Sequence, residues 1–194
     1  MIYLVRHGRT ALNAAGCLQG RVDEPLDEVG IRQATGVARR LMDEAPEAQV
    51  WSSPLRRARE TAALLVGERS DDTVQIDERW IELDYGVLDG VPVGDVPATT
   101  WESWRTDPTF RPQGGESFGE LDARVHAACE AIRASWDGGD LVIVSHVSPI
   151  KSAVAWALGA DPSVAHRSRL DQAAVCRIDI GRQGPVLVGF NERW

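Results

Sequence analysis

Cysteine is scarce in the sequence, and its few positions form no recognisable pattern. Only Cys17, Cys129 and Cys176 occur, far apart and odd in number. Because no Cys-x-x-Cys pair exists, the sequence offers neither a zinc knuckle nor a dithiol redox motif. We therefore expect reduced thiols in a protein of the cytoplasm, where structural disulfides are rare.

Long apolar runs and an excess of positive charge are also missing. No run approaches the ~20 residues that a membrane-spanning helix needs. The start, MIYLVRHG, has five residues before its first charge, too few for the apolar region of a signal peptide. The formal net charge of −8 and the isoelectric point near 5.0 argue against broad binding to nucleic acids or anionic membranes. They do not exclude a local basic pocket for a small anion.

What the chain does contain is an alternation of strand and helix patterns over 194 residues, enough for one α/β domain. The expected strands cover residues 2–5, 50–51, 74–76 and 141–144, followed by a hairpin of 174–180 and 185–190. The expected helices begin near residues 30 and 54 and cover about 121–136 and 149–158. This alternation predicts a three-layer α/β/α sandwich with a mainly parallel central sheet. We expect a single domain over 1–194, with an irregular cap segment around 83–115.

Apolar residues at helical spacing predict which side two of these helices bury. In the first helix the expected buried residues are Ile31, Ala34, Ala38 and Leu41. The second begins around Pro54, which suits the first turn of a helix because its missing N–H costs nothing there. Its expected buried residues are Leu55, Ala58, Ala62 and Leu65.

Histidines follow two of the expected strands at the edge where ligands bind. His7 comes after the strand of residues 2–5, and His146 comes after the strand of residues 141–144. Because ligands of open α/β sheets bind beyond the carboxyl ends of the strands, we expect the two imidazoles at one site. Taken singly, each histidine is as compatible with a structural role as with a functional one. The neighbouring residues must therefore decide between the two roles.

Charged residues suited to phosphoryl transfer accompany the histidines. Arg6 precedes His7, and Arg56 and Arg57 open the second helix, whose N-terminal dipole favours an anion. Planar, permanently charged arginines match phosphoryl oxygens. Glu82 can supply the proton that a leaving alcohol needs, since a phosphate beside it would raise its pKa. No clustered metal-ligand pattern appears, so we expect a site without metal or cofactor.

The order of these residues resembles the histidine phosphatase (phosphoglycerate-mutase-like) superfamily over nearly the whole chain. The resemblance is carried by LVRHGRT at 4–10, SPLRRARETA at 53–62, ELDYG at 82–86 with its ending Asp89-Gly90, GGES at 114–117 and VSH at 144–146. Smaller companions are Asn13, Gln19-Gly20, Asp23, Pro25-Leu26, Gly30 and Gln33-Ala34. An isolated Arg-His-Gly is a weak signal, but five motifs in the right order are a strong one.

The resemblance implies roles for the residues that match. His7 would be the phosphorylated nucleophile, and Glu82 would be the proton donor. The phosphate pocket would comprise Arg6, Arg57 and His146. Within the second motif the phosphate-binding arginine stands immediately before alanine, which favours Arg57 and leaves Arg56 as the alternative.

Further contacts are implied around this pocket, and two of them depart from the family pattern. Asn13 and the backbone of Gly20 would donate hydrogen bonds to the phosphate. Arg9 stands where many relatives carry Glu or Gln, which adds positive charge at the rim. Val147 stands where most relatives begin a Gly-rich turn. The sequence at this point is similar to that of α-ribazole phosphatases. Because Val147 is not proline, its backbone N–H is available to the substrate.

Three functions stay open on this basis. The first is a phosphomonoesterase, in which water attacks phospho-His7; the second is a phosphoglycerate-mutase-type phosphotransferase, which must keep that intermediate dry. The third is a non-catalytic phospho-ligand binding protein. Relatives of the mutase type carry a longer insertion between the acid motif and the Gly-Gly-Glu motif, whereas only 31 residues, Leu83 to Gln113, lie there. This favours hydrolysis over the mutase reaction. A non-catalytic binding protein would lack the nucleophile or the acid, and neither is missing from this sequence.

The expected partner is a small phosphorylated metabolite, with α-ribazole phosphate and broad specificity both left open. Trp101 and Trp104, within the cap segment, are interpreted as packing residues rather than a substrate platform. His126 and His166 are interpreted as structural or surface histidines. We expect no nucleic-acid or membrane partner, and leave a homodimer open.

Overall fold

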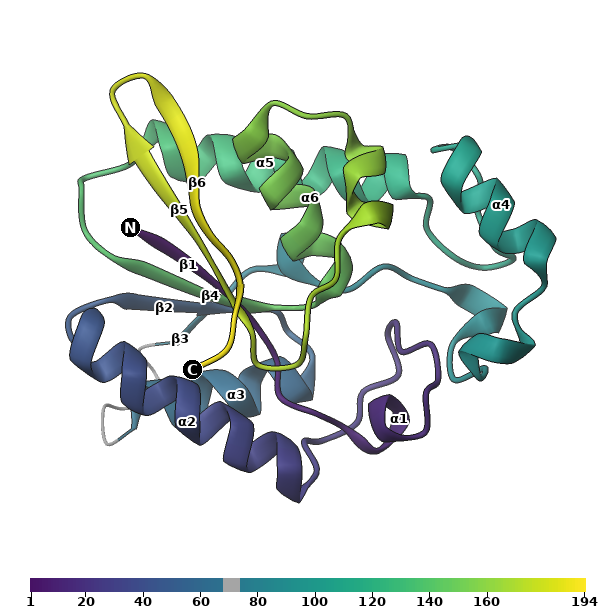
Figure 1. Cartoon of the computed structure of the whole chain (residues 1–194), viewed down its shortest axis with the longest axis horizontal. Helices are drawn as coiled ribbons and strands as arrows, with labels where there is room; N and C mark the ends of the chain where they lie inside the picture. Colours follow the sequence, from purple (N-terminus) through teal and green to yellow (C-terminus); the bar gives the residue numbers. More distant parts are fainter. Residues whose placement is uncertain (68–73) are drawn as a thin grey trace.

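The computed structural model describes residues 1–67 and 74–194, and six strands in this part of the chain form one sheet (Figure 1). The strands are β1 Ile2–Arg6, β2 Gln49–Ser52, β3 Val74–Ile76, β4 Leu141–Ser145, β5 Val175–Gly181 and β6 Gly184–Glu192. Their order is β3-β2-β4-β1-β5-β6. The pairs β3–β2, β2–β4 and β4–β1 are parallel, whereas β5 and β6 join as an antiparallel hairpin. The predicted strands and the mainly parallel sheet are confirmed.

Helices cover both faces of this sheet (Figure 1). The α-helices are α1 Ala11–Ala14, α2 Glu28–Glu44, α3 Arg56–Val66, α4 Ala98–Thr106, α5 Phe118–Ala134 and α6 Val147–Leu158. Shorter 3₁₀ turns are η2 Glu78–Trp80, η3 Gly86–Leu88, η4 Val93–Asp95 and η5 Pro162–Arg167. Helices α2 and α3 lie on one face and α5 and α6 on the other, which confirms the three-layer sandwich. Within the described residues, no helix is both long and apolar enough to cross a bilayer.

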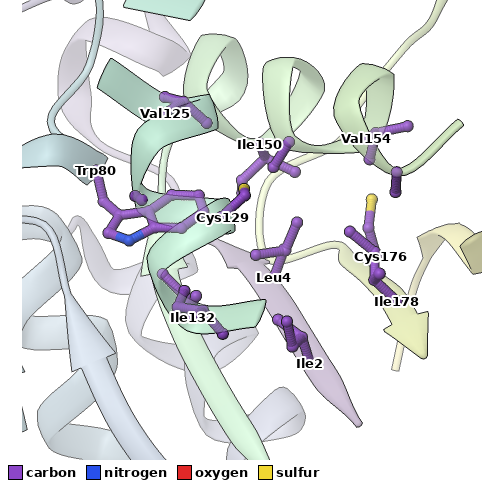
Figure 2. Close-up of a cluster of buried hydrophobic side chains, with 14 of the residues drawn as sticks. Ile2, Leu4, Trp80, Val125, Cys129, Ile132, Ile150, Val154, Cys176 and Ile178 are labelled. Atoms are coloured by element: carbon purple, nitrogen blue, oxygen red, sulfur yellow. The ribbon is translucent and has the colours of Figure 1, made fainter. Parts of the chain in front are cut away.

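The core under α5 and α6 is aliphatic around one tryptophan, Trp80 (Figure 2). Helix α5 begins at a capping box, in which Ser117 and Glu120 satisfy each other's backbone N–H groups. Its apolar stripe then faces the sheet, and Val125 and Ile132 are buried against residues of β1 and β4. Each such side chain stabilises the fold by about 1.5–3 kcal/mol relative to full exposure.

The second core, under α2 and α3, corrects one sequence-based expectation. Ile31 is 47% exposed rather than buried. The buried face of α2 runs instead through Gly30, Ala34, Val37, Ala38 and Leu41. Gly30 takes the first position because a Cβ there would lie 2.1 Å from the carbonyl oxygen of Arg9, an approach that only glycine allows. The predicted buried side of α3 is confirmed in full.

The segment expected to be irregular contains a helix, so that expectation was wrong for α4. This helix follows Pro97 without a side-chain N-cap, and its only large apolar residues are two tryptophans, which left little periodic signal. Trp104 is buried with Leu18 and Val96 in a separate small cluster, and Trp101 packs against it at 5.1 Å between ring centroids. The packing role expected for these tryptophans is confirmed.

Candidate active site

The register of the sheet brings the two predicted histidines together. Strands β1 and β4 are parallel neighbours, and Arg6 pairs with Ser145. His7 and His146 are the next residues on each strand, so they leave the sheet side by side, with ring centroids 5.0 Å apart. Both are buried, at 3% and 0% exposure. A site of two adjacent imidazoles therefore follows from strand pairing alone.

Two hydrogen bonds fix the proton of His7 on one nitrogen. Its Nδ1 lies 2.7 Å from the carbonyl oxygen of Gly8, which can only accept. Its Nε2 receives the Nε–H of Arg57 at 3.2 Å. The proton therefore belongs on Nδ1, and the lone pair belongs on Nε2. Burial, followed by the charges of Arg57 and Arg6, holds the pKa of His7 well below its ordinary value, so the imidazole is neutral and nucleophilic.

Arg57, and not Arg56, lies beside the nucleophile. Its side chain is fully buried at the start of α3, and its two Nη atoms donate to the carbonyl oxygens of Val22 and Gly20 at 2.9 and 2.7 Å. Arg56 points outward, is 58% exposed, and pairs with Glu60 at 2.7 Å. The geometry thus agrees with the arginine that the motif favoured.

The loop that holds Arg57 is itself clamped by Asp89, a residue to which the sequence assigned no role. The Asp89 carboxylate accepts the backbone N–H groups of Gly20, Arg21 and Val22, at 2.7, 2.7 and 2.8 Å. The carbonyls of the same loop accept from Arg57. The Gly20 N–H, predicted as a donor to phosphate, is therefore engaged by Asp89. The available signal was the position of Asp89 at the end of the acid motif, next to Gly90.

Arg6 supplies a second cation at the end of β1. One Nη donates to the carbonyl oxygen of Leu170 at 2.7 Å, while its Nε is buried and has no hydrogen-bond partner within the described residues. Burial lowers the pKa of Arg6 to about 10, opposed by the nearby carboxylates of Glu82 and Asp171. The group therefore stays charged at neutral pH, with one donor atom unused.

His146 has one satisfied and one unsatisfied ring nitrogen. Its Nε2 lies 2.7 Å from the hydroxyl oxygen of Ser53, which also accepts the backbone N–H of Leu55 at 3.3 Å. Its buried Nδ1 has no partner among the described residues. Burial and the charge of Arg57 lower the pKa of His146 well below its ordinary value, so this ring is also neutral. Ser53 is a positioning residue that sequence reasoning did not identify.

Glu82 is a buried carboxyl group, 4% exposed, between the strand ends and α6. Its Oε1 accepts the backbone N–H groups of Leu83 and Ser148, at 2.7 and 3.3 Å. Burial raises the pKa of Glu82, and this effect exceeds the opposing ones of those hydrogen bonds and of Arg57 and Arg6. A carboxyl group that holds its proton longer than usual suits a general acid.

The segment that carries Glu82 is anchored from two sides. Arg124 of α5 donates to the carbonyl oxygens of Arg79 and Glu82, at 2.7 and 3.3 Å. The same guanidinium makes a bidentate pair with Glu116, at 2.7 and 2.9 Å. Glu116 belongs to the Gly-Gly-Glu-Ser motif, so this motif orients the arginine that holds the acid segment.

The remaining predicted residues, Asn13, Arg9 and Val147, differ in how they relate to the residues described above. Asn13 donates to Gln19 Oε1 at 3.0 Å, near the loop that Arg57 contacts. Arg9 turns toward the start of α2, where its Nε pairs with Asp27 at 2.7 Å. Val147 is the first residue of α6, so its N–H is one that a helix leaves without an intrahelical partner.

In residues 1–67 and 74–194, no group of three or more His, Cys, Asp or Glu could hold a metal ion, and all three cysteines are free.

Comparison with known proteins agrees with this geometry. The sequence profile of the histidine phosphatase superfamily (branch 1) matches residues 2–193. A probable phosphoglycerate mutase GpmB of Yersinia pestis is 34% identical over 183 residues, covering 92% of this chain and 84% of the relative. The chain spans about half the length of a group of mycobacterial relatives, which are 34% identical over 177 residues, covering 90% of this chain and 48% of each relative.

Solved structures with the same architecture include those of phosphatases. A phosphoserine phosphatase mutant of Entamoeba histolytica, in complex with phosphoserine, superposes with a TM-score of 0.89 at 25% identity, covering 99% of this chain and 96% of that one. The alpha-ribazole phosphatase of Shigella flexneri superposes with a TM-score of 0.85 at 28% identity, covering 99% and 96%.

Proposed function

Because the chain belongs to the histidine phosphatase superfamily, we propose that it is a metal-independent phosphomonoesterase of small phosphorylated metabolites, acting through a phosphohistidine on His7. One observation carries the proposal. The lone pair of His7 Nε2 lies in a buried site beside the Arg57 guanidinium, with the neutral ring of His146 adjacent. Such a site supplies a nucleophile and fixed positive charge, the two components that phosphoryl transfer needs most.

In the first step, His7 Nε2 attacks phosphorus in line with the ester oxygen. The N–P bond forms as the P–O bond breaks, and Glu82 gives its proton to the departing alkoxide. Arg57, which already donates toward Nε2, transfers this hydrogen bond to a phosphoryl oxygen. The unused Nε–H of Arg6 is a further donor that this anion would engage. The unused Nδ1 of His146 is another, in the tautomer whose Nε2 accepts from the Ser53 hydroxyl.

In the second step, the ionised Glu82 takes a proton from water as the water oxygen attacks phosphorus. The N–P bond breaks, inorganic phosphate leaves, and both His7 and Glu82 return to their starting protonation states. The Nδ1–H of His7 stays on the carbonyl oxygen of Gly8 throughout. The whole cycle therefore moves a single proton through one carboxyl group.

A mutase is the second candidate, favoured by the resemblance to a probable phosphoglycerate mutase. A mutase must return the phosphoryl group to its substrate before water reaches it. Hydrolysis is preferred because the segment from Leu83 to Gln113 has only 31 residues, whereas mutase-type relatives carry a longer insertion at this point.

The test is to trap the intermediate. The enzyme is mixed with ³²P-labelled p-nitrophenyl phosphate in EDTA and quenched in alkali, where phosphohistidine survives and phosphoserine does not. We expect a label that is stable to alkali, labile to acid and located on His7, with His7→Ala abolishing both label and turnover. His126→Ala, a mid-helix histidine of α5, is the matched control. Full turnover by His7→Ala, or activity that EDTA removes, would overturn the proposal.

A further inference from the structure

A cavity is lined by residues of α4, α5, α6 and η5, and one of them, Ser148, contacts Glu82 of the candidate active site. We call it the α4–α6 pocket; its lining includes Trp104, Phe118, Asp122, Ser148, Ser152 and His166. Its volume is about 290 Å³, at the lower end of the ~300–1,000 Å³ typical of small-molecule sites. The pocket has room for one ring or a short polyol.

Ser148 joins this pocket to the acid. Its backbone N–H donates to Glu82 Oε1 at 3.3 Å, while the residue also lines the pocket. Ser152 lies one helical turn further along α6, about 5–6 Å away, and its hydroxyl donates to Asp122 Oδ1 at 2.5 Å. The pocket and the acid therefore share Ser148, and Asp122 lies about one helical turn of α6 further into the pocket.

The walls of the pocket are aromatic and well supported. Phe118 packs edge-on against His166, with ring centroids 5.1 Å apart, and against Trp104 at 6.4 Å. The η5 segment is tied to α6 by Lys151, whose ammonium group donates to the carbonyl oxygens of Ala165 and Ser168, at 3.0 and 2.6 Å. These contacts make the pocket a built feature of the fold.

The carboxylate of Asp122 lies at the base of the pocket, and Arg105 lies at its rim. Burial raises the pKa of Asp122, with Asp161 adding like charge, against the hydrogen bond from Ser152. Burial and the charges of Lys151 and Arg105 lower the pKa of His166, so this ring adds no positive charge. Arg105 and Asp161 also line the pocket, but both are exposed to solvent, where their charges are screened more than that of the half-buried Asp122.

We infer that the α4–α6 pocket receives the leaving group of the phosphomonoester, and that this group carries hydroxyl donors and no second negative charge. Asp122 accepts a hydrogen bond from a hydroxyl of that group, while Phe118 packs against its carbon face. A carboxylate in the same place would face the carboxylates of Asp122 and Asp161. This inference rests on the proposed phosphatase function and names the class of substrate that it would favour.

The test compares two substrates that differ only at the group facing Asp122. Glycerol 3-phosphate ends in a hydroxyl, and 3-phosphoglycerate ends in a carboxylate. We expect kcat/KM to favour glycerol 3-phosphate by about tenfold or more, the usual consequence of placing like charges together. Asp122→Asn should narrow this ratio at least about threefold by removing the repulsion. Asp43→Asn, on the exposed side of α2, is the matched control.

A second variant places the substitution at an exposed residue, whereas Asp122 is half-buried. Thr106 is exposed at the mouth of the pocket, so Thr106→Arg adds a cation there and should also shift the ratio toward 3-phosphoglycerate. Thr99→Arg, exposed on the same helix, should leave it unchanged. Preference of the wild type for 3-phosphoglycerate, or a ratio that neither variant moves, overturns the inference. Turnover of p-nitrophenyl phosphate, measured in parallel, reports separately on the phosphatase function.

Discussion

The phosphate side of the site and the α4–α6 pocket differ in what they are built from. On the phosphate side, His7, Arg57 and His146 sit at the ends of strands or at the start of a helix, at most 3% exposed. Each is held by backbone carbonyls or a buried hydroxyl. The α4–α6 pocket has one wall from α5 and α6 and the other from α4 and η5, which lie outside the sheet layers and carry exposed polar residues.

This difference teaches which changes should affect every substrate and which should affect only some. In the proposed reaction a group fixed by the sheet would meet the phosphoryl group, which all substrates share, so its loss should lower all rates alike. A group in the pocket meets the part of the substrate that varies, so its change should alter ratios between substrates. Single substitutions on the two sides can test this division.

The largest effect is expected for Glu82→Gln. Glutamine keeps the shape but cannot give up a proton, so kcat/KM for glycerol 3-phosphate should fall by about 10²–10⁴-fold, the range that general acid catalysis contributes. p-Nitrophenyl phosphate should lose far less, because its phenolate leaves without protonation. Steady-state kinetics on both substrates measures the contrast, and equal losses would count against Glu82 as the acid.

The pH profile provides the control for that variant. Burial raises the pKa of Glu82, and the protonated form is the active one, so kcat/KM of the wild type should fall as pH rises through this pKa, by about tenfold per unit. The pKa of His7 is lowered well below its ordinary value of 6.5, so its neutral form persists at acid pH. Protonation of His7 should therefore cause no fall in kcat/KM near pH 6.5. Glu82→Gln should lack the alkaline limb; a limb that survives in the variant would belong to another group.

A smaller loss is expected for Asp89→Asn, which acts through Arg57. An asparagine presents an NH₂ group to N–H donors, so the three bonds to Gly20, Arg21 and Val22 cannot all persist. Losing one charge-assisted bond costs about 1.5–3 kcal/mol, which corresponds to about a tenfold to hundredfold fall in kcat/KM. Competition by inorganic phosphate should weaken in parallel, because the loop no longer holds the arginine that binds it.

Asp95→Asn, exposed in η4, is the matched control for Asp89→Asn and should leave both quantities unchanged. A merely structural role for Asp89 would lower the melting temperature and leave the inhibition constant for phosphate in the remaining folded enzyme as it was. That result would contradict the positioning role.

Much of the phosphate side could be predicted from the sequence because its logic is local. His7 and His146 each stand one residue beyond an apolar run, after Arg6 and Ser145, and parallel pairing of such runs puts the residues that follow them side by side. Arg57 required the motif as well, because helical spacing alone does not distinguish it from Arg56. The structure separates the two by burial, with Arg57 inside and Arg56 outside.

The supporting contacts could not be predicted in the same way, because they join distant loops. Asp89 and Gly20 are 69 positions apart, and nothing in either segment alone indicates that three N–H groups converge on one carboxylate. Helix α4 was missed for a different reason: it buries Trp104 against Leu18 and Val96, so it is stabilised by tertiary packing rather than by a periodic stripe of its own.

The smallest effect is expected for Arg9→Gln, which tests where the phosphate side ends. Arg9 follows the Arg-His-Gly signature and was expected at the pocket rim, yet its guanidinium pairs with Asp27, with the two side chains 35% and 23% exposed. Surface ion pairs of this kind contribute about 0–1 kcal/mol, and Asp27 keeps its N-cap bond to Gly30 without it. We therefore expect kcat/KM to change by less than about threefold on every substrate. A tenfold loss shared by glycerol 3-phosphate and p-nitrophenyl phosphate would instead extend the phosphate side outward to Arg9, because only a contact with the common phosphoryl group lowers both rates equally.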